Sequence, residues 1–308
     1  MNKKVEISVV VPVYGCKGAL MELYKRTQKT LERLFDSYEI IYVDDNCPQN
    51  SWEIVEELCS QDPNVVGIKM SRNFGQMKAI LAGLDASCGE WVVVMDCDLQ
   101  DSPEDIEKLY DKAREGYDIV FSRRKKRHDN KLKIAVSKVF YKIYSVLTED
   151  CYDPAMSNYC ICNRNVIDNF CKMRECHRAF TMYLKWLGFN STIIDVEHSN
   201  RKEGKSSYSM RKRFKLAGDI IFSQSDKILQ MIVKSGFVLS FISAVVAIIM
   251  VIRYFIYDIA SGWTSIIVTL TLLGGLILVA IGCVGIYVGK TFIQVKNRPL
   301  YVVQKKIN

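Results

Sequence analysis

Two carboxylates separated by one residue, Asp96 and Asp98, could bind a divalent cation. They stand at the end of the apolar run at 91–96, where a tight bend would direct both side chains to one site. Carboxylate oxygens are hard ligands that Mg²⁺ and Mn²⁺ prefer and commonly share with substrate phosphates. A D-x-D pattern alone is common by chance, and residues 101–104 could simply cap and begin a helix. The position after a strand-like run favours the cation site.

Five short apolar runs, all rich in β-branched residues, must position these carboxylates. The runs lie at residues 7–13, 39–44, 65–70, 91–96 and 118–122. Amphipathic, helix-like segments such as 17–36 and 51–60 separate them. Such runs are typical of strands buried on both faces of a parallel sheet, and their alternation with helices predicts an α/β, doubly wound fold. Because ligands bind beyond the carboxyl ends of parallel strands, we expect the acidic residues after the second and fourth runs to meet at one edge.

The composition excludes several classes of protein and leaves the partner open. The chain has 308 residues, of which 49% are hydrophobic and 25% charged. Intrinsically disordered and collagen-like chains are excluded, because the first lack apolar residues and the second are rich in Gly and Pro. The net charge of +8 suits phosphate-rich partners, which include nucleotides, anionic lipids and nucleic acid, without choosing among them.

The eleven cysteines are scattered, with no C-x-x-C pair, and the chain has only 3 histidines, which argues against a structural zinc site. The N-terminal MNKKVEIS has no apolar core and predicts no secretory signal. We therefore expect reduced thiols in a cytosolic domain, with the cysteines acting mainly as small buried hydrophobic residues.

The C-terminal third contains two long stretches without a charged residue, at 235–252 and 262–289. Crossing a bilayer core of about 30 Å takes roughly 20 apolar residues in a helix, so both stretches predict membrane spans. The first is short and needs the apolar residues after Arg253 as well. The alternative is a pair of buried core helices, which seldom run this long without a charge.

Basic residues on the outer flanks of these stretches predict the topology. The linker at 254–261 has no Lys or Arg, so the positive-inside bias puts both flanks in the cytoplasm. Residues 211–232 alternate basic and apolar side chains, as helices lying in the membrane interface do. The predicted organisation of this multi-pass inner-membrane protein is a cytoplasmic α/β domain, interfacial helices, a two-helix transmembrane hairpin and a cytosolic tail, at residues 1–210, 211–234, 235–289 and 290–308.

Motifs along nearly the whole chain resemble one enzyme family. They comprise VVVPVYG, VDDN, SRNFGQMKAILAGLDAS, VVVMDCDLQDSPE, DPAMSNYCICNRNVID, RKEGKSSYSMRK and the terminal KNRPLY. In this order they resemble family 2 glycosyltransferases with a GT-A domain. The nearer resemblance is to the polyprenyl-phosphate group, which includes dolichol-phosphate mannose synthase and bactoprenol glucosyltransferase. No single motif is specific, but their combination in order is.

The resemblance implies a role for individual residues. Those implied to hold the nucleotide are Pro12, Val13, Tyr14, Asp44, Ser71, Asn73 and Asp96. Those implied to hold the metal, Mg²⁺ or Mn²⁺, and the diphosphate are Asp96, Asp98 and Gln100. Those implied for the phosphates and the acceptor are Arg123, Arg201, Lys205 and Ser206, and the implied catalytic residues are Asp153, Asp98 and Arg201. The basic run that begins at Arg123 could equally be a solvated loop.

The chain departs from the family pattern at two places. Gly15 and Cys16 stand where the family often has Asn and Glu, so a glutamate contact to the nucleotide is missing. Ser207 stands where the family usually has a basic residue after the loop serine, and Lys205 offers a substitute charge.

The resemblance implies transfer of a hexose from a nucleotide-sugar donor to undecaprenyl or another polyprenyl phosphate, with inversion and a divalent metal. UDP and glucose are the first choices, and the sugar stays open. A divalent ion would stabilise the leaving diphosphate as a Lewis acid. Because a phosphate monoester has a second pKa of about 6, the acceptor is already ionised near neutral pH. Asp153 therefore positions the acceptor or removes a proton.

Two other functions fit part of the sequence. A processive polysaccharide synthase shares the D-x-D region, but the chain lacks Q-x-x-R-W and has only two predicted spans. A non-catalytic, membrane-anchored nucleotide-sugar-binding protein would not need the complete D-x-D pair and phosphate loop. Nucleic acid is not an expected partner, because the basic residues gather beside the membrane segments. The hairpin either tethers the enzyme or contacts the prenyl chain, and its glycines at 274, 275, 282, 285 and 289 could pack within it or in a homo-oligomer.

Overall fold

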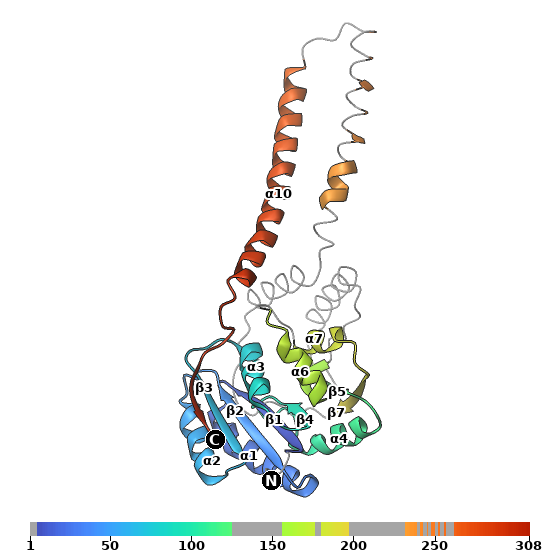
Figure 1. Cartoon of the computed structure of the whole chain (residues 1–308). Coiled ribbons are helices and arrows are strands. Elements are labelled where there is room, and N and C mark those ends of the chain that lie inside the picture. Colours follow the sequence, from blue (N-terminus) through green and yellow to red (C-terminus); the bar gives the residue numbers. More distant parts are fainter. Residues whose placement is uncertain are drawn as a thin grey trace. The chain divides into compact units, whose positions relative to one another are not determined.

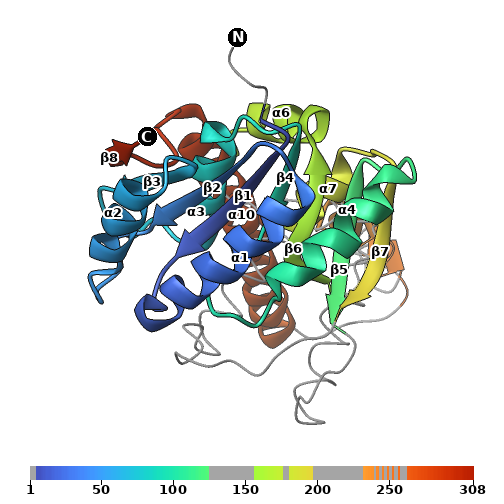
Figure 2. The same ribbon diagram turned by 90° about the horizontal axis from the view of Figure 1, so that it is seen from below.

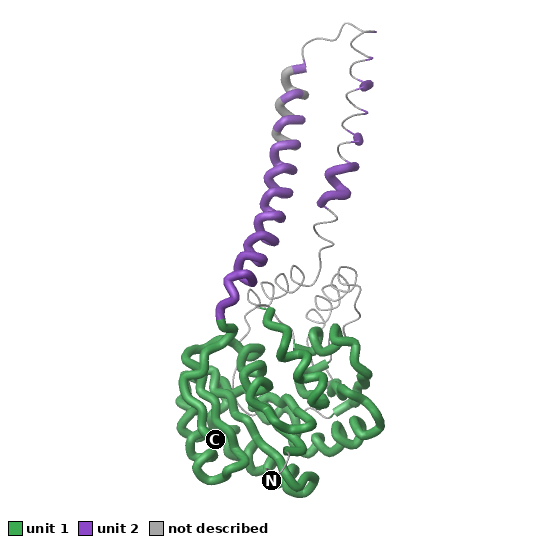
Figure 3. The backbone as a smooth tube through the Cα atoms, viewed as in Figure 1, with its two compact units in different colours: residues 1–141, 152–209, 299–308 green, residues 142–151, 210–298 purple. Residues whose placement is uncertain are grey.

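The computed structural model describes residues 5–124, 156–175, 180–196, 232–238 and 262–308, with isolated positions between 241 and 256. The chain forms two compact units, which Figure 3 distinguishes by colour. The first comprises Met1–Tyr141, Tyr152–Ser209 and Pro299–Asn308, and the second comprises Lys142–Cys151 and Met210–Arg298.

The first unit is built on one eight-stranded sheet, in the order β7-β5-β6-β4-β1-β2-β3-β8 (Figures 1 and 2). The strands are β1 (Ile7–Val13), β2 (Tyr38–Asp44), β3 (Val65–Met70), β4 (Trp91–Val94), β5 (Ile119–Arg124), β6 (Met156–Asn163), β7 (Ser191–Val196) and β8 (Val303–Ile307). The five strands predicted from apolar runs are all present, and their positions agree with β1 to β5.

The sheet is mixed, which corrects the expectation of a parallel sheet. Strands β3, β2, β1 and β4 are parallel neighbours, as predicted. Strand β6 lies between β4 and β5 and is antiparallel to both, while β5 pairs with β7 in parallel. The side chains of an apolar run show that a strand is buried but not the direction of its neighbour, so the sequence did not reveal the insertion of β6.

Helices cover both faces of the sheet (Figure 2). They are α1 (Leu20–Leu34), α2 (Ser51–Gln61), α3 (Gln76–Ala86), α4 (Ile106–Arg114), α6 (Arg164–Lys172) and α7 (Phe180–Trp186), with 3-10 turns at Lys17–Ala19 and Pro103–Asp105. Strand β1 alternates between two cores: Val9 and Val11 pack with residues of α1, α2 and α4, and Val10 packs with residues of α3, α6 and α7. The parallel strands are thus buried on both faces.

Helix α3 lies unusually close to the centre of the sheet because of one glycine. A Cβ added at Gly83 would stand 2.3 Å from Cγ1 of Val10 and 3.1 Å from Cγ2 of Val43. Only a residue without a side chain allows the helix this approach to β1 and β2. The close packing fixes the position of Gln76, the first residue of α3, near the carboxyl edge of the sheet.

The C-terminal segment returns to the first unit and closes the edge of the sheet. Strand β8 pairs with β3 in antiparallel orientation. Just before it, the carbonyl of Val302 accepts a hydrogen bond from Ser71 N at 2.9 Å, and the Tyr301 hydroxyl donates to Asp85 Oδ2 at 2.6 Å. The sequence predicted a tail over 290–308 and did not reveal this strand.

The second unit contains one helix that could span a membrane by its length and apolar composition, among the residues that the structure describes. Helix α10 (Trp263–Val295) contains this segment at Leu273–Val295, none of which is buried in the protein. It begins where the second span was predicted and continues beyond residue 289. For the first predicted span, the structure describes helical residues 232–238 and a few later positions, so the two-helix hairpin stays a prediction.

Candidate active site

The candidate site lies where the order of the parallel strands reverses. The chain builds β1, β2 and β3 outward in one direction and then adds β4 on the other side of β1. In open α/β sheets, ligands bind beyond the carboxyl ends of the strands at such a switch point. The loops after β1 and β4 therefore flank the expected ligand position. Of the acidic residues named from the sequence and described here, Asp96 and Asp98 lie in the loop after β4 and Asp44 ends β2.

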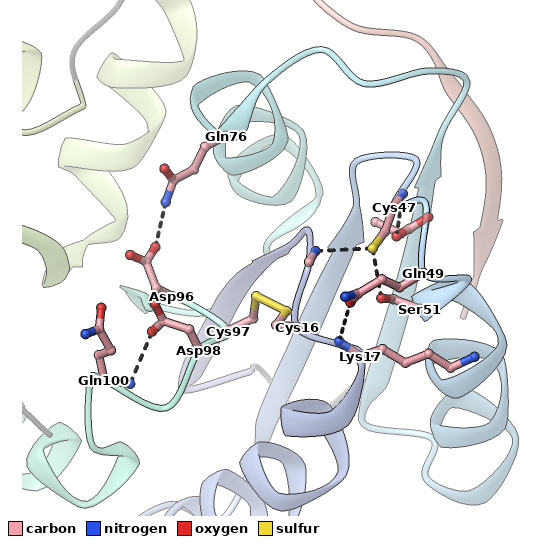
Figure 4. The surroundings of a disulfide bond; sticks show 12 residues. Cys16, Lys17, Cys47, Gln49, Ser51, Gln76, Asp96, Cys97, Asp98 and Gln100 are labelled. Carbon is pink, nitrogen blue, oxygen red and sulfur yellow. Dashed lines mark hydrogen bonds between the residues drawn. A yellow bond between two sulfur atoms is a disulfide. The ribbon is translucent and has the colours of Figure 1, made fainter. Parts of the chain in front are cut away.

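Asp96 and Asp98 lie in the loop after β4, and Gln76 approaches them from α3 (Figure 4). Gln76 Nε2 donates to Asp96 Oδ1 at 2.7 Å, and Gln100 N donates to Asp98 Oδ1 at 3.1 Å. Leu99 has a φ of 60°, in the left-handed region that a side chain seldom adopts. The bend predicted after this strand is thus present, and it directs both carboxylates to one side.

Asp44 is buried at the end of β2, which makes its carboxyl group unusual. Its Oδ1 accepts a hydrogen bond from Cys47 N at 3.3 Å. Burial raises the pKa of Asp44 to about 6 and outweighs the opposing effects of that hydrogen bond and of the Lys69 charge. An acceptor that changes its protonation state near pH 6 could bind an N–H group of a ligand above that pH.

Asp45 is a structural partner of the site that the sequence did not reveal. Its two carboxylate oxygens accept hydrogen bonds from Phe74 N at 2.7 Å and Gly75 N at 2.8 Å. Gly75 has a φ of 95°, which favours glycine at this turn into α3. Asp45 therefore holds the segment that carries Ser71 and Asn73. The sequence shows the two adjacent acids in VDDN, but it does not show which backbone groups the second acid binds.

The other predicted nucleotide residues occupy different environments. Pro12 and Val13 are buried within β1, and the Val13 carbonyl accepts a hydrogen bond from Asp45 N at 3.1 Å. Tyr14, the next residue, is 42% exposed and offers an aromatic ring at the carboxyl edge. Ser71 and Asn73 are exposed in the segment after β3.

Arg123, which was predicted to contact the acceptor, lies at the same edge of the sheet. It lies near the end of β5, opposite Met156 of β6, and its Nε donates to Asp195 Oδ1 of β7 at 2.7 Å. This ion pair fixes the direction of the guanidinium group. The remaining residues predicted for the acceptor lie outside the described residues: Asp153, Arg201, Lys205 and Ser206.

The described residues fit a divalent cation that is held partly by the protein and partly by a bound substrate. No group of three His, Cys, Asp or Glu side chains suited to a metal occurs in the described ranges. Asp96, Asp98 and the Gln100 amide supply hard oxygens side by side, which is fewer than a cation needs from protein alone (Figure 4). Mg²⁺ in such sites is typically held by one or two carboxylates together with substrate phosphates and water.

A disulfide joins Cys16 and Cys97, which corrects the expectation of reduced thiols at these two positions (Figure 4). Their Cα atoms are 6.2 Å apart, although 81 positions separate them in sequence. The fold causes this meeting, because β1 and β4 are neighbours and each cysteine lies in the loop after its strand. The other cysteines in the described part of the chain are free thiols, most of them buried as predicted.

Comparison with known proteins supports the fold and the family. Residues 8–172 match the family model described as glycosyl transferase family 2. The chain is 31% identical over 98% of its length to the undecaprenyl-phosphate 4-deoxy-4-formamido-L-arabinose transferase of Proteus mirabilis, of which it covers 94%. It is 30% identical over 97% of its length to the SfII prophage-derived bactoprenol glucosyl transferase of Shigella flexneri, of which it covers 98%.

A solved structure has a similar fold. It is the glucosyl-3-phosphoglycerate synthase of Mycobacterium tuberculosis, crystallised with Mn²⁺, UDP and phosphoglyceric acid. The TM-score is 0.50 at 16% identity, over 71% of this chain and 76% of that chain. At this identity the likeness concerns the fold, a mixed α/β sheet of the GT-A type.

Proposed function

Since the chain belongs to glycosyl transferase family 2 and is a glycosyltransferase, we propose that it transfers a hexose from a nucleotide diphosphate-sugar to a polyprenyl phosphate at the cytosolic face of the membrane. The observation that carries the proposal is the position of Asp96 and Asp98 beside the β1–β4 switch point. The acceptor is proposed from two relatives of nearly equal length, whose names specify undecaprenyl phosphate and bactoprenol.

The donor would bind across the loops after β1 and β4. Asp44 would accept an N–H of the base, and the exposed ring of Tyr14 would stack on it. Ser71 and Asn73 would border the nucleotide from the segment that Asp45 holds. Asp96, Asp98 and Gln100 would hold Mg²⁺ or Mn²⁺, which supplies positive charge to the leaving diphosphate.

The acceptor phosphate would enter from the β5–β6 side. Arg123, with Arg201, Lys205 and Ser206 of the basic loop, would neutralise the lipid phosphate and bring two anions together. The phosphate is already mostly ionised near neutral pH, so it needs little help to attack the anomeric carbon. Asp153, three positions before β6 begins, would orient this group or accept its last proton. A single displacement inverts the anomeric configuration.

The membrane segments would bring the enzyme to its lipid substrate. We propose that residues 235–252 cross the membrane together with α10 as a hairpin, and that residues 211–234 lie in the interface and connect it to the catalytic domain at 1–210. A polyprenyl tail cannot leave the bilayer, so its phosphate has to be met at the surface. Basic residues on both flanks favour the cytosolic side of the inner membrane.

The two relatives are named for different sugars. One relative is named for glucose and the other for a formamido-arabinose, so the family likeness alone does not select a donor. We take UDP-glucose as the first choice, because the bactoprenol relative is named a glucosyl transferase.

A transfer assay with the full chain in detergent tests this function. Undecaprenyl phosphate and Mg²⁺ or Mn²⁺ would be incubated with a panel of radiolabelled UDP- and GDP-sugars, with and without EDTA. We expect organic-extractable label from one donor and its loss with EDTA. Folded protein that yields no lipid-linked label from any donor would contradict the proposal, and label that persists in EDTA would contradict its metal dependence.

A further inference from the structure

We propose that the Cys16–Cys97 pair is a thiol–disulfide clamp that sets the affinity of the donor site for nucleotide. The inference rests on the proposed function, since it assumes that the loops after β1 and β4 bind a nucleotide diphosphate. In the disulfide form the two loops are covalently joined, and in the dithiol form they are not.

The bridge joins both halves of the candidate donor site. Cys97 stands between Asp96 and Asp98, so the bond fixes the backbone that carries these carboxylates. Cys16 follows Gly15, whose N–H donates to Cys47 Sγ at 3.2 Å, and Cys47 N in turn donates to Asp44 Oδ1 at 3.3 Å. A short series of contacts thus leads from the disulfide through Cys47 to the buried carboxyl proposed to bind the base. Figure 4 shows the disulfide and Cys47.

The strands alone leave these loops poorly connected. The register between β1 and β4 ends at Val10 opposite Val94, and the Met95 N to Val10 O hydrogen bond of 3.1 Å is the last one described along it. Beyond them β4 ends, whereas β1 continues beside β2 to Val13 and no longer pairs with β4. The disulfide then joins the loops that follow the two strands, at the edge of the sheet where the ligand is expected.

The pairing is specific to this place in the fold. Cys160 and Cys162 lie on β6 with their sulfur atoms 4.0 Å apart and remain thiols. Cys47, whose sulfur accepts hydrogen bonds from Gly15 N and Ser51 Oγ, is a free thiol as well. Cys16 is 1% exposed and Cys97 7%, so a bound donor over these loops would further restrict access to the bond.

The dithiol form of Cys16 and Cys97 is converted to the disulfide form by exchange with a small-molecule disulfide such as oxidised glutathione. The Cys97 thiolate attacks one sulfur of the oxidant and releases a thiolate. The Cys16 thiolate then attacks the mixed disulfide at Cys97 and releases the second, so two thiols are oxidised and one external disulfide is reduced to two thiols. In a cytosolic domain the thiol pool reduces most disulfides, and those that form are usually catalytic or redox-sensing.

Because the coupling between nucleotide binding and disulfide formation is reciprocal, the clamp can be tested without measuring sugar transfer. If the disulfide form binds nucleotide about tenfold more tightly, then bound nucleotide must favour the disulfide by the same factor. For a two-electron couple, tenfold corresponds to a shift of about 30 mV toward more negative midpoint potential.

The experiment compares UDP–Mn²⁺ binding to two preparations of the full chain in detergent by calorimetry. One is oxidised with glutathione disulfide, and the other is reduced with dithiothreitol and desalted anaerobically. We expect the Kd to be about tenfold higher for the reduced form. The double variant C16S/C97S should bind like the reduced protein whether or not it is treated with reductant. C88S, which changes an exposed free thiol, should respond to reductant as the unmodified chain does.

Redox titration in glutathione buffers, read by mass spectrometry of alkylated thiols, provides the second measurement. We expect saturating UDP–Mn²⁺ to shift the midpoint of the Cys16–Cys97 pair by about 30 mV toward the negative. Equal Kd values in both redox forms, or a midpoint that nucleotide does not move, would overturn the clamp and leave the proposed function intact. Folded protein that binds neither UDP nor GDP in either form would overturn both. If C16S/C97S does not fold, the comparison on the unmodified chain decides.

Discussion

The burial of Asp44 links donor binding to pH. Its pKa of about 6 means that the carboxyl is protonated below that pH in the folded protein and ionised above it. Because this pKa is raised above that of the unfolded chain, the folded state takes up a proton as the pH falls through 6. Asp44 therefore stabilises the fold toward lower pH, and it cannot be the cause of acid unfolding there.

We predict that affinity for UDP–Mn²⁺ falls up to about tenfold per pH unit below pH 6, because a protonated carboxyl loses the charge that makes it a strong acceptor for the base N–H. Asp44→Asn should bind weakly at pH 7 and lose the pH dependence. Calorimetric titrations between pH 5 and 8, with the melting temperature as a check on folding, measure this. An Asp44→Asn variant whose pH profile matches the unmodified chain would remove Asp44 from the binding site.

Gln76 is predicted to act as a positioning residue through Asp96. Removing the 2.7 Å hydrogen bond in Gln76→Ala should lower kcat/KM about ten- to a hundredfold, since a hydrogen bond to a charged group contributes roughly 1.5 to 3 kcal/mol. Gln76→Glu would place a second negative charge beside Asp96 and should cost more. Kinetics at several Mn²⁺ concentrations would test the role, because a misplaced carboxylate raises the metal requirement. Unchanged metal dependence in both variants would contradict it.

At the scale of elements, β8 is predicted to stabilise the donor side of the sheet. It covers the edge of β3, and the residue before it binds Ser71 N. Truncation after Val302 should lower the melting temperature by about 5 °C, equivalent to roughly 2 kcal/mol in a domain of this size. Lys305→Ala, which removes only an exposed ion pair with Glu56, is the control and should change little. Equal melting temperatures for the truncated and full chains would contradict this role.

The elements also explain what could be predicted from the sequence. Strands β1 to β4 are encoded locally by β-branched runs, and the positions of Asp44, Asp96 and Asp98 follow from them. Strand β8 is short and largely polar, so its residues gave no apolar pattern. The partners of Asp45 and of Cys16 are fixed only by the packing of distant segments, because the order of the strands decides which loops meet.

At the scale of the whole molecule, α10 makes a prediction about solvent access. Cys283 lies within the apolar segment Leu273–Val295, and Cys88 is an exposed thiol of the catalytic domain. In open membrane fragments, a membrane-impermeant maleimide should label Cys88 and leave Cys283 unmodified, because a thiol in the bilayer core meets neither water nor the reagent. Mass spectrometry of the two peptides gives both yields in one sample. Comparable labelling of both cysteines would contradict a membrane-spanning α10.

The assignment of the active site is tested most directly by the rate at which Asp98→Asn forms lipid-linked sugar from undecaprenyl phosphate. The unmodified chain and Asp111→Asn are measured beside it. Asp111 is an exposed carboxylate on α4 and serves as the matched control. We predict that Asp98→Asn stays folded and loses at least about a hundredfold in rate, since each 1.4 kcal/mol of lost transition-state stabilisation costs a factor of ten, and that Asp111→Asn keeps its rate. Transfer by Asp98→Asn at the rate of the unmodified chain would contradict the assignment of this edge of the sheet as the active site.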